Sequence, residues 1–224
     1  MAPLKRQSID LSTFENLIEG SEIIVTHKRW PKVIRKGAVY TKFFSYDNKG
    51  IRRRHLNPVA TEFVRNAERI TALGINTIRP DFWARCPEAE CDVVSYESVP
   101  GRTVYNAYQS DQDPGLLTKL AKYIAELHGK NFYFRHGHSD NYLIQDDGSF
   151  AIIDMDNVRY SMNRRRKAKN LFYLLDHAVR NDRDLYQRYG VANFLEAYFT
   201  SASTPAADRE FILGNLRKRG LVIN

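Results

Sequence analysis

Cysteine, long apolar runs and internal repeats are scarce or absent in this sequence of 224 residues, and each shortage excludes a class of protein. Two cysteines, Cys86 and Cys91, are too few for a secreted disulfide scaffold of this length, so we expect reduced thiols in a cytosolic protein. The strictly apolar runs are far shorter than the roughly 20 residues of a membrane-spanning helix. The opening residues, MAPLKRQSID, lack the apolar core of a secretory signal. We therefore expect a globular cytoplasmic protein.

The chain is basic. Lysine and arginine together number 34, and aspartate and glutamate 26, which gives a formal net charge of +8 at pH 7. Much of the excess lies in two clusters, RRR at 52–54 and RRRK at 164–167. A basic surface favours nucleotide phosphates, anionic lipid or nucleic acid as a partner, although each cluster is equally explained as a solvated loop or helix face. The arginines lack interleaved aromatic residues and no nucleic-acid-binding motif is present, so no nucleic acid is expected.

The residues up to 97 are predicted to form strands with one helix. Apolar and β-branched runs predict strands at 22–26, 32–35, 38–44 and 91–96. Apolar residues three or four positions apart predict a helix over 58–73, and Gly74 would end it.

The residues from 98 onward are predicted to form helices around one short hairpin. Asp113 and Pro114 begin a helix whose apolar stripe ends at His128, which we expect to be a packed core histidine. The predicted hairpin strands, 142–144 and 150–153, flank the turn dipeptide Asp147-Gly148. Further helices are predicted over 171–179 and 194–199. The pattern indicates an α+β, bilobal chain, with a β-rich lobe at 1–97, a compact helical lobe at 98–224 and a cleft between them.

A polar loop, YFRHGHSDN at 133–141, leads into this hairpin, and the return strand ends at a carboxylate. The hairpin can bring Asn141 and Asp154 to the same end. Their amide and carboxylate oxygens would suit Mg²⁺, with phosphate and water completing the octahedron. Asn141 could instead be a turn residue. Asp154 follows three apolar residues, so it would be at least half-buried and would need a partner.

This arrangement resembles the protein-kinase-like fold, in which H-R-D-x-x-x-x-N precedes a hairpin and then D-F-G. Alignment on Asn141 places Arg135 on the loop arginine and Asp154 on the D-F-G aspartate. The resemblance implies that Lys42 is the phosphate-binding lysine of the third strand, although a lone strand lysine could simply be exposed.

Two further segments extend the resemblance. The helix at 58–73 corresponds to the αC helix, and Glu62 stands nearest the expected place of its glutamate, with Glu68 second. Residues 96–101, YESVPG, resemble the hinge, where Glu97 and Val99 would hold adenine through backbone hydrogen bonds. One kinase-like domain would thus comprise both lobes.

Within that fold, the segments KVIRKGAVYTK at 32–42 and FVRNA at 63–67 resemble the lipopolysaccharide core kinase family, which includes toluene-tolerance and InaA-like relatives. The resemblance implies an ATP- and Mg²⁺-dependent phosphotransferase. Its acceptor would be a heptose or Kdo sugar of the lipopolysaccharide inner core, presented as an anionic glycolipid. Peripheral association with the inner membrane would follow.

Three departures from the kinase pattern favour an alternative, a pseudokinase that binds or regulates. His136 stands where the general-base aspartate is expected, residues 20–42 contain only two glycines, and Asp154-Met155-Asp156 replaces D-F-G. Loss of a general base costs about 10²- to 10⁴-fold in rate, so turnover could persist. His136, His138 or Asp140 would then be the substitute base.

Overall fold

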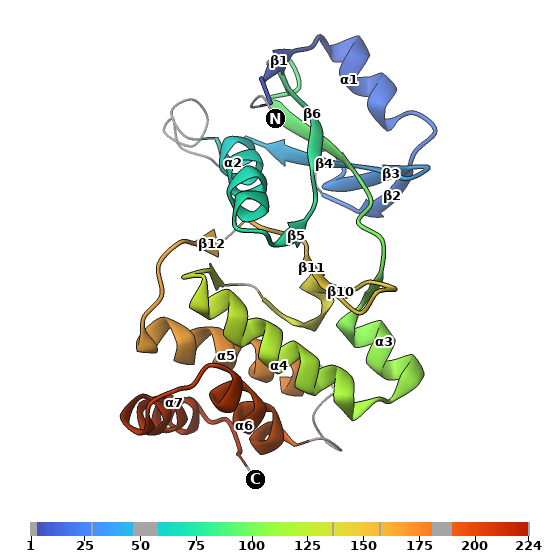
Figure 1. The fold of residues 1–224 in the computed structure, drawn as a ribbon. Coiled ribbons are helices and arrows are strands. Elements are labelled where there is room, and N and C mark those ends of the chain that lie inside the picture. Colours follow the sequence, from blue (N-terminus) through green and yellow to red (C-terminus); the bar gives the residue numbers. More distant parts are fainter. Residues whose placement is uncertain are drawn as a thin grey trace. The chain divides into compact units, whose positions relative to one another are not determined.

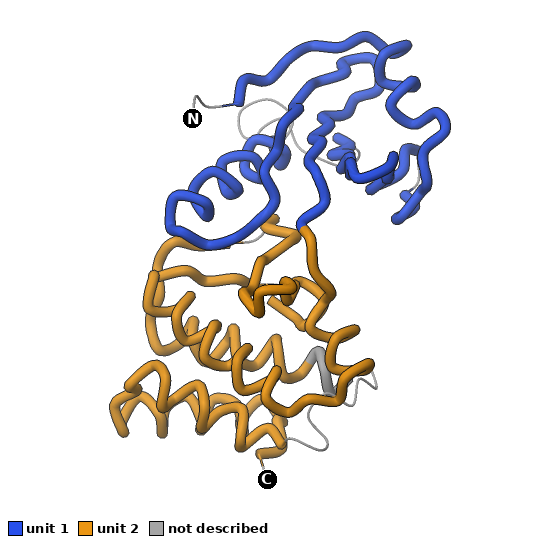
Figure 2. Tube along the Cα trace, turned by 45° about the vertical axis from the view of Figure 1, so that its right-hand side comes forward, with its two compact units in different colours: residues 1–99 blue, residues 100–224 orange. Residues whose placement is uncertain are grey.

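The computed structural model describes residues 4–27, 29–46, 58–135, 137–156, 158–180 and 190–223, with the side chains of 177–180 left out. The basic cluster at 52–54 and the candidate base His136 lie outside these residues. The chain divides into two compact units, Met1–Val99 and Pro100–Asn224 (Figure 2). Strands dominate the first unit and helices the second (Figure 1). The α+β fold class, with a β-rich part followed by a helical part, is therefore confirmed.

The first unit is built on a six-stranded sheet in the order β1-β6-β7-β4-β3-β2. The sheet strands are β1 (Gln7–Ser8), β2 (Glu22–Val25), β3 (Val33–Lys36), β4 (Val39–Ser45), β6 (Pro80–Cys86) and β7 (Cys91–Glu97). The remaining elements are α1 (Leu11–Ile18), α2 (Val59–Ala72) and β5 (Asn76–Thr77). The predicted strands and the predicted helix are thus present within a few residues, whereas β1, β5, β6 and α1 were not predicted.

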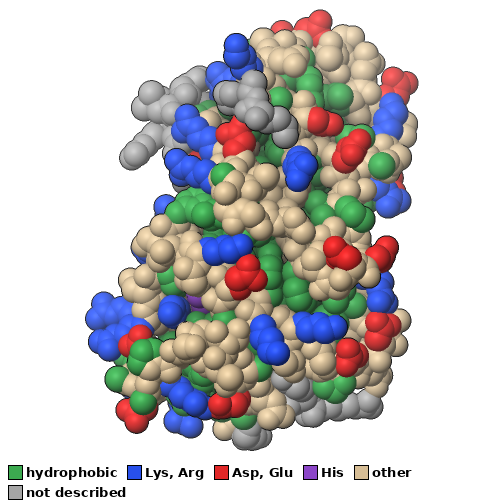
Figure 3. All heavy atoms as spheres, viewed as in Figure 1, with side chains coloured by type: hydrophobic (Ala, Val, Ile, Leu, Met, Phe, Trp, Pro, Cys, Tyr) green, Lys and Arg blue, Asp and Glu red, His purple; other side chains and the backbone are tan. Residues whose placement is uncertain are grey.

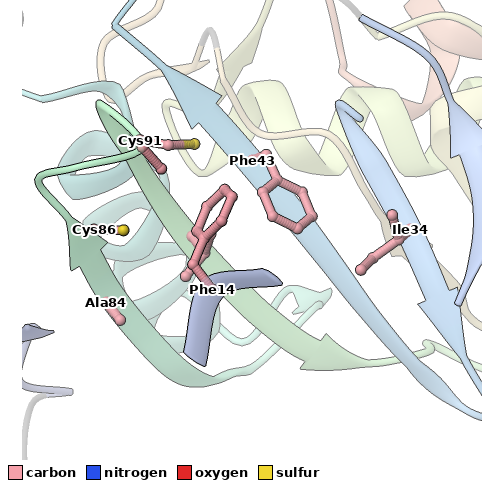
Figure 4. Close-up of a cluster of buried hydrophobic side chains, with 8 residues drawn as sticks. Phe14, Ile34, Phe43, Ala84, Cys86 and Cys91 are labelled. Atoms are coloured by element: carbon pink, nitrogen blue, oxygen red, sulfur yellow. The ribbon is translucent and has the colours of Figure 1, made fainter. Parts of the chain in front are cut away.

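Helix α1 is held on the sheet by one aromatic residue. Phe14 is fully buried and meets Trp30 edge-to-face at 4.9 Å and Phe43 at 5.4 Å between ring centroids. Cys86 and Cys91 belong to the same buried cluster and carry free thiols (Figure 4). Burial of this kind stabilises the fold by removing apolar surface from water.

The second unit packs helices beside a short antiparallel hairpin. Its elements are β8 (Arg102–Thr103), α3 (Val104–Asp111), α4 (Pro114–Gly129), β9 (Tyr133–Phe134), the 3-10 helix η2 (Ser139–Asn141), β10 (Tyr142–Ile144), β11 (Phe150–Ile152), β12 (Val158–Arg159), α5 (Arg164–Arg180), α6 (Val191–Ser201) and α7 (Ala206–Lys218). Asp113 caps α4 as predicted, accepting a hydrogen bond from Gly115 N–H at 2.8 Å. Helix α5 starts earlier than predicted, so the basic cluster at 164–167 forms its first turn. No helix within the described ranges has both the length and the apolar composition of a membrane span.

Candidate functional site

The β10–β11 hairpin brings the two predicted metal ligands together. Tyr142 pairs with Ile152, and beyond that pair Ile153 N–H donates to the Asn141 carbonyl oxygen at 3.0 Å. Asp154 is the next residue along the chain. Asn141 and Asp154 therefore lie at the same end of the hairpin, as the turn signal in the sequence predicts.

Asn141 is fixed in position by both its backbone and its side chain. Its N–H donates to the His138 carbonyl at 2.9 Å within η2, and the side chain is only 6% exposed. The amide nitrogen Nδ2 lies 3.1 Å from His138 Nε2. Because the amide nitrogen faces the imidazole, the amide oxygen is directed away from it, as an oxygen ligand for a cation must be.

His138 and Asp140 form a second pair in the same loop. Since Nε2 of His138 accepts from the Asn141 amide, the proton of the neutral ring resides on Nδ1, which lies 3.6 Å from Asp140 Oδ2. Both side chains are part-buried, at 27% and 30% exposure. In this arrangement His138 positions Asn141, and the Asp140 carboxylate is the stronger candidate to accept a proton. Arg135, which follows β9, is exposed.

Asp154 has an unusual backbone. Its φ is +59°, a left-handed conformation that residues other than glycine rarely adopt and that asparagine and aspartate tolerate best. The side chain is half-buried, as predicted, and the following Met155 is fully buried. Strained backbone of this kind clusters at functional sites, where the surrounding structure holds it.

A series of hydrogen bonds between buried side chains holds the start of the 133–141 loop. Asn170 of α5 donates from Nδ2 to the Phe134 carbonyl, and its Oδ1 lies 2.8 Å from His128 Nε2. His128 Nδ1 in turn lies 2.8 Å from the Tyr198 hydroxyl of α6. His128 is thus the packed core histidine that the sequence predicts. Asn170 was missed, and the only signal was a polar residue just before a predicted apolar helix.

Gly137 occupies a position in this loop where no side chain fits. A Cβ there would overlap the Tyr142 hydroxyl and would lie 3.1 Å from Phe134 Cδ1 and 3.2 Å from the Phe134 carbonyl oxygen. Tyr142 is fully buried and cannot move aside easily, because its ring meets Phe134 edge-to-face at 5.8 Å. Sequence reasoning did not single out this glycine.

Gly137→Ala is therefore expected to destabilise the second unit by about 1–3 kcal/mol, the usual cost of overpacking, and to displace the loop. Urea unfolding measures the loss, and hydrogen exchange of the 137–141 amides measures the displacement. Gly129→Ala is the matched control, since a Cβ at that exposed helix end meets nothing within 4 Å. Equal stability of the two variants would contradict the prediction.

Lys42 lies on β4 in the first unit and is almost completely buried. It is 5% exposed, and its Nζ lies 4.9 Å from the ring centroid of Phe63 on α2 and 5.6 Å from that of Phe44. The interpretation as an ordinary exposed lysine is therefore wrong. Lysine side chains are seldom buried unless a partner compensates their charge, so Lys42 does not occupy an ordinary surface position.

The other candidates in the first unit differ in exposure. Glu62 lies beside Phe63 on α2 and is part-buried. Glu97 is the last residue of β7 and is exposed, whereas Val99 is part-buried. Between them, Ser98 N–H donates to the Ala38 carbonyl at 2.8 Å, which extends the pairing of β7 with β4 into the predicted hinge.

A pocket of about 340 Å³ lies in the second unit, away from the Asn141–Asp154 pair. Its lining comes from the turn of the hairpin, from α3 and from the start of α4, and includes Ile144, Gly148 and Leu116. Arg102 and Asp111 form a two-pronged ion pair at its edge, at 3.2 and 2.7 Å. This pocket is at the opposite end of the hairpin from the candidate ligands and does not serve them.

The donor set of the pair suits magnesium held jointly with a phosphate. Among the described residues, no three His, Cys, Asp or Glu side chains cluster as a metal site would require. An amide and a carboxylate supply two hard oxygens, and Mg²⁺ is commonly bound by one or two protein carboxylates plus substrate phosphate and water. Asn141 and Asp154 therefore fit a nucleotide-borne Mg²⁺ better than a metal held by protein alone.

Comparisons with known proteins find similar structures. No protein-family model and no curated protein matches the chain. The bifunctional kinase-methyltransferase WbdD is similar at a TM-score of 0.49 and 13% identity, with 83% of this chain and 47% of WbdD covered. A co-crystal structure of WbdD with the kinase inhibitor LY294002 matches at a TM-score of 0.49 and 13% identity, over 84% of this chain and 47% of that one. The apo GRMZM2G135359 pseudokinase is similar at a TM-score of 0.45 and 11% identity, over 95% of this chain and 96% of that one. This chain thus spans just under half the length of WbdD.

Proposed function

We propose that the protein binds Mg-ATP and transfers a phosphoryl group to an alcohol, with a sugar hydroxyl of the lipopolysaccharide inner core as the acceptor. The observation that carries the proposal is the end of the β10–β11 hairpin, where Asn141 is locked by three hydrogen bonds beside a strained Asp154. Phosphoryl transfer depends mainly on positioning and charge neutralisation, and a rigid pair of hard oxygens supplies both.

Each residue has a separate part in the proposal. Asn141 and Asp154 would hold Mg²⁺, which when bound neutralises phosphate charge. Asp140 would accept the proton of the acceptor hydroxyl, while His138 keeps the Asn141 amide oriented.

The remaining roles rest on the resemblance. Lys42 would bind phosphate, with Glu62 as its partner. Glu97 and Val99 would hold adenine through their backbone groups. Arg135 and His136 would stand beside the acceptor.

A pseudokinase is the second candidate function, and two observations favour it. His136 replaces the expected aspartate, and the Nε2 of the neighbouring His138 is engaged with Asn141. Nucleotide would then bind through the same pair without turnover. Release of ADP in the presence of a lipopolysaccharide-core acceptor separates the two functions.

Asp154→Asn is the sharpest test of the nucleotide site. Asparagine keeps the shape and tolerates the left-handed backbone, so the variant removes the charge and leaves the fold. We expect millimolar Mg-ATP to raise the melting temperature of the wild type and to leave that of Asp154→Asn unchanged. Lys42→Met is expected to weaken the shift as well.

Asp146→Ala is the matched control, because Asp146 is an exposed carboxylate at the other end of the same hairpin. It should retain the full Mg-ATP shift. A wild type that shows no shift would contradict nucleotide binding altogether, and an unchanged shift in Asp154→Asn would contradict the assigned site.

A further inference from the structure

Cys86 and Cys91 face each other across the hairpin of β6 and β7. Cys86 is the last residue of β6, Cys91 is the first of β7, and the antiparallel ladder pairs them directly. Residues paired in this way have Cα atoms about 4.5–5.5 Å apart and side chains on the same face of the sheet. Disulfides join Cα atoms about 4.4–6.8 Å apart, so the register of these strands suits a bond between the two sulfurs.

Both thiols are free and protected in the closed structure. Charged side chains are spread over the face drawn in Figure 3, whereas both cysteines are 0% exposed and belong to the cluster around Phe14 (Figure 4). The Cys86 thiol lies 3.6 Å from Glu88 Oε2, and the Cys91 thiol donates to the Asp92 carbonyl oxygen at 3.3 Å. Burial raises the pKa of Cys86, so this thiol stays protonated at neutral pH. An oxidant therefore reaches reactive sulfur only when this part of the hairpin opens.

The turn between the cysteines, residues 87–90, is the part that can open. Pro87, Glu88 and Glu90 are exposed, and Glu90 N–H donates to the Pro87 carbonyl oxygen at 3.0 Å. Ala89 is instead buried in the same cluster as the cysteines. Local openings of this kind cost less free energy than global unfolding. Opening the turn takes Ala89 out of the cluster and admits a small oxidant to both sulfurs.

Neighbouring segments hold the turn closed. Trp30 Nε1 donates to the Ala89 carbonyl oxygen at 3.0 Å, and Tyr46 N–H donates to the Glu90 carbonyl oxygen at 2.9 Å. Arg29 and Glu90 add an ion pair at 3.8 Å, with both side chains about half exposed, at 49% and 48%. Arg29 and Trp30 lie between β2 and β3, so the turn is coupled to that connection.

We propose that Cys86 and Cys91 form a reversible intramolecular disulfide when a peroxide oxidises the protein, and that this bond keeps the β6–β7 turn closed. In the open turn, one thiolate attacks the peroxide O–O bond, which gives a sulfenic acid and a hydroxide that is protonated to water. The second thiolate then attacks the sulfenic sulfur, the S–S bond forms, and the oxygen leaves as a second water. The two thiols together lose two electrons, and one peroxide becomes two waters.

The pairing of the cysteines decides the product. A sulfenic acid without a nearby thiol is oxidised further to a sulfinic acid, which ordinary reductants do not reverse. Here the second thiol belongs to the facing residue, with four residues, 87–90, between the two cysteines. The disulfide therefore forms before a second peroxide reacts. None of these residues has a part in nucleotide binding, so the proposal is independent of the proposed function.

The test treats the full chain with millimolar hydrogen peroxide, blocks the remaining thiols with iodoacetamide in denaturant, and measures the mass of the tryptic peptide 86–102, which contains both cysteines. We expect a loss of about 2 Da without alkylation, and recovery of both thiols with dithiothreitol. In Cys86→Ala and in Cys91→Ala the remaining cysteine should gain oxygen instead. Oxygen on both cysteines of the wild type, a bond between two chains, or unreacted thiols would each overturn the proposal.

A matched pair of variants tests whether oxidation requires opening of the turn. Trp30→Phe keeps an aromatic ring beside Phe14 and removes the hydrogen bond to Ala89, so disulfide formation should be about fivefold faster, the worth of one such bond. Arg29→Gln removes the exposed ion pair to the same turn and should change the rate less than about twofold. Equal rates in the two variants would contradict this route.

Hydrogen exchange tests the effect of the bond on the turn. The amides of residues 88–90 should exchange more slowly in the oxidised chain than in the reduced chain, because the disulfide joins the two ends of the turn. The amides of residues 145–148, in the turn of the β10–β11 hairpin, should exchange equally in both. Unchanged exchange at 88–90 in the oxidised chain would show that the bond does not keep the turn closed.

Discussion

Acidification from pH 7 to pH 4 is expected to remove about 3 kcal/mol of stability through one side chain, His128. Burial lowers the pKa of His128 from 6.5 to about 4, with the Asn170 hydrogen bond opposing the shift. The unfolded chain therefore takes up the proton first. The stability that the neutral ring contributes is complete above pH 6.5 and is lost as the pH falls toward 4.

His128→Gln isolates this effect. Glutamine is neutral at both pH values, so the variant should lose less stability on acidification. It does not fill the buried site of the imidazole ring, so it should be less stable than the wild type at pH 7.5. Urea unfolding at pH 7.5 and 4.5 measures the two losses. His27→Gln changes an exposed imidazole and should leave the wild-type loss in place. Parallel losses in wild type and His128→Gln would show that this ring does not titrate in that range.

The elements that the sequence predicts are those whose signal is local. Phe63, Ala67 and Ile70 of α2 are all buried, as their helical spacing requires. The β10–β11 hairpin follows from two apolar runs around Asp147-Gly148, and Gly148 adopts a φ of +78°. Neighbouring residues decide each of these features, so no knowledge of the rest of the chain is needed.

The missed elements depend on partners far along the chain. The sequence of β6, PDFWARC, carries charges that break a strand pattern, and Arg85 is accommodated only because Asp92 lies opposite it on β7. Helix α1 is short and is held by Phe14 in the sheet core. The sequence did not decide between a loop and a helix face for the first turn of α5, because four consecutive cations give no apolar periodicity.

The residues of the candidate site also differ in whether local sequence predicts them. Asn141 and Asp154 were predictable because one hairpin connects them. Gly137 and Asn170 were not, because their importance comes from Tyr142 and from Phe134, which only the folded chain places against them. The hairpin pattern thus predicts that Asn141 and Asp154 lie at one end of it, whereas the residues that hold this loop in place are visible only in three dimensions.

Asp92→Ala is expected to cost the protein about 3–5 kcal/mol, because it removes one partner of a buried ion pair. Asp92 is fully buried, and its Oδ1 accepts from Arg85 Nε at 3.0 Å across the β6–β7 ladder. The Arg85 side chain is only 18% exposed and lies 5.2 Å from the ring centroid of Tyr46. Without the carboxylate, this guanidinium would remain desolvated with its charge uncompensated.

The same sheet contains a matched pair that differs in exposure. Glu22 and Arg35 also face each other across neighbouring strands and bond at 2.6 Å, but both side chains are about half exposed, at 56% and 45%. Water already solvates these charges, so Glu22→Ala should change the urea midpoint little. Asp92→Asn keeps an oxygen for Arg85 and should fall between the two alanine variants. If Asp92→Ala unfolds at the same urea concentration as Glu22→Ala, the buried ion pair does not stabilise the pairing of β6 with β7, and the packing of Arg85 against Tyr46 must do so instead.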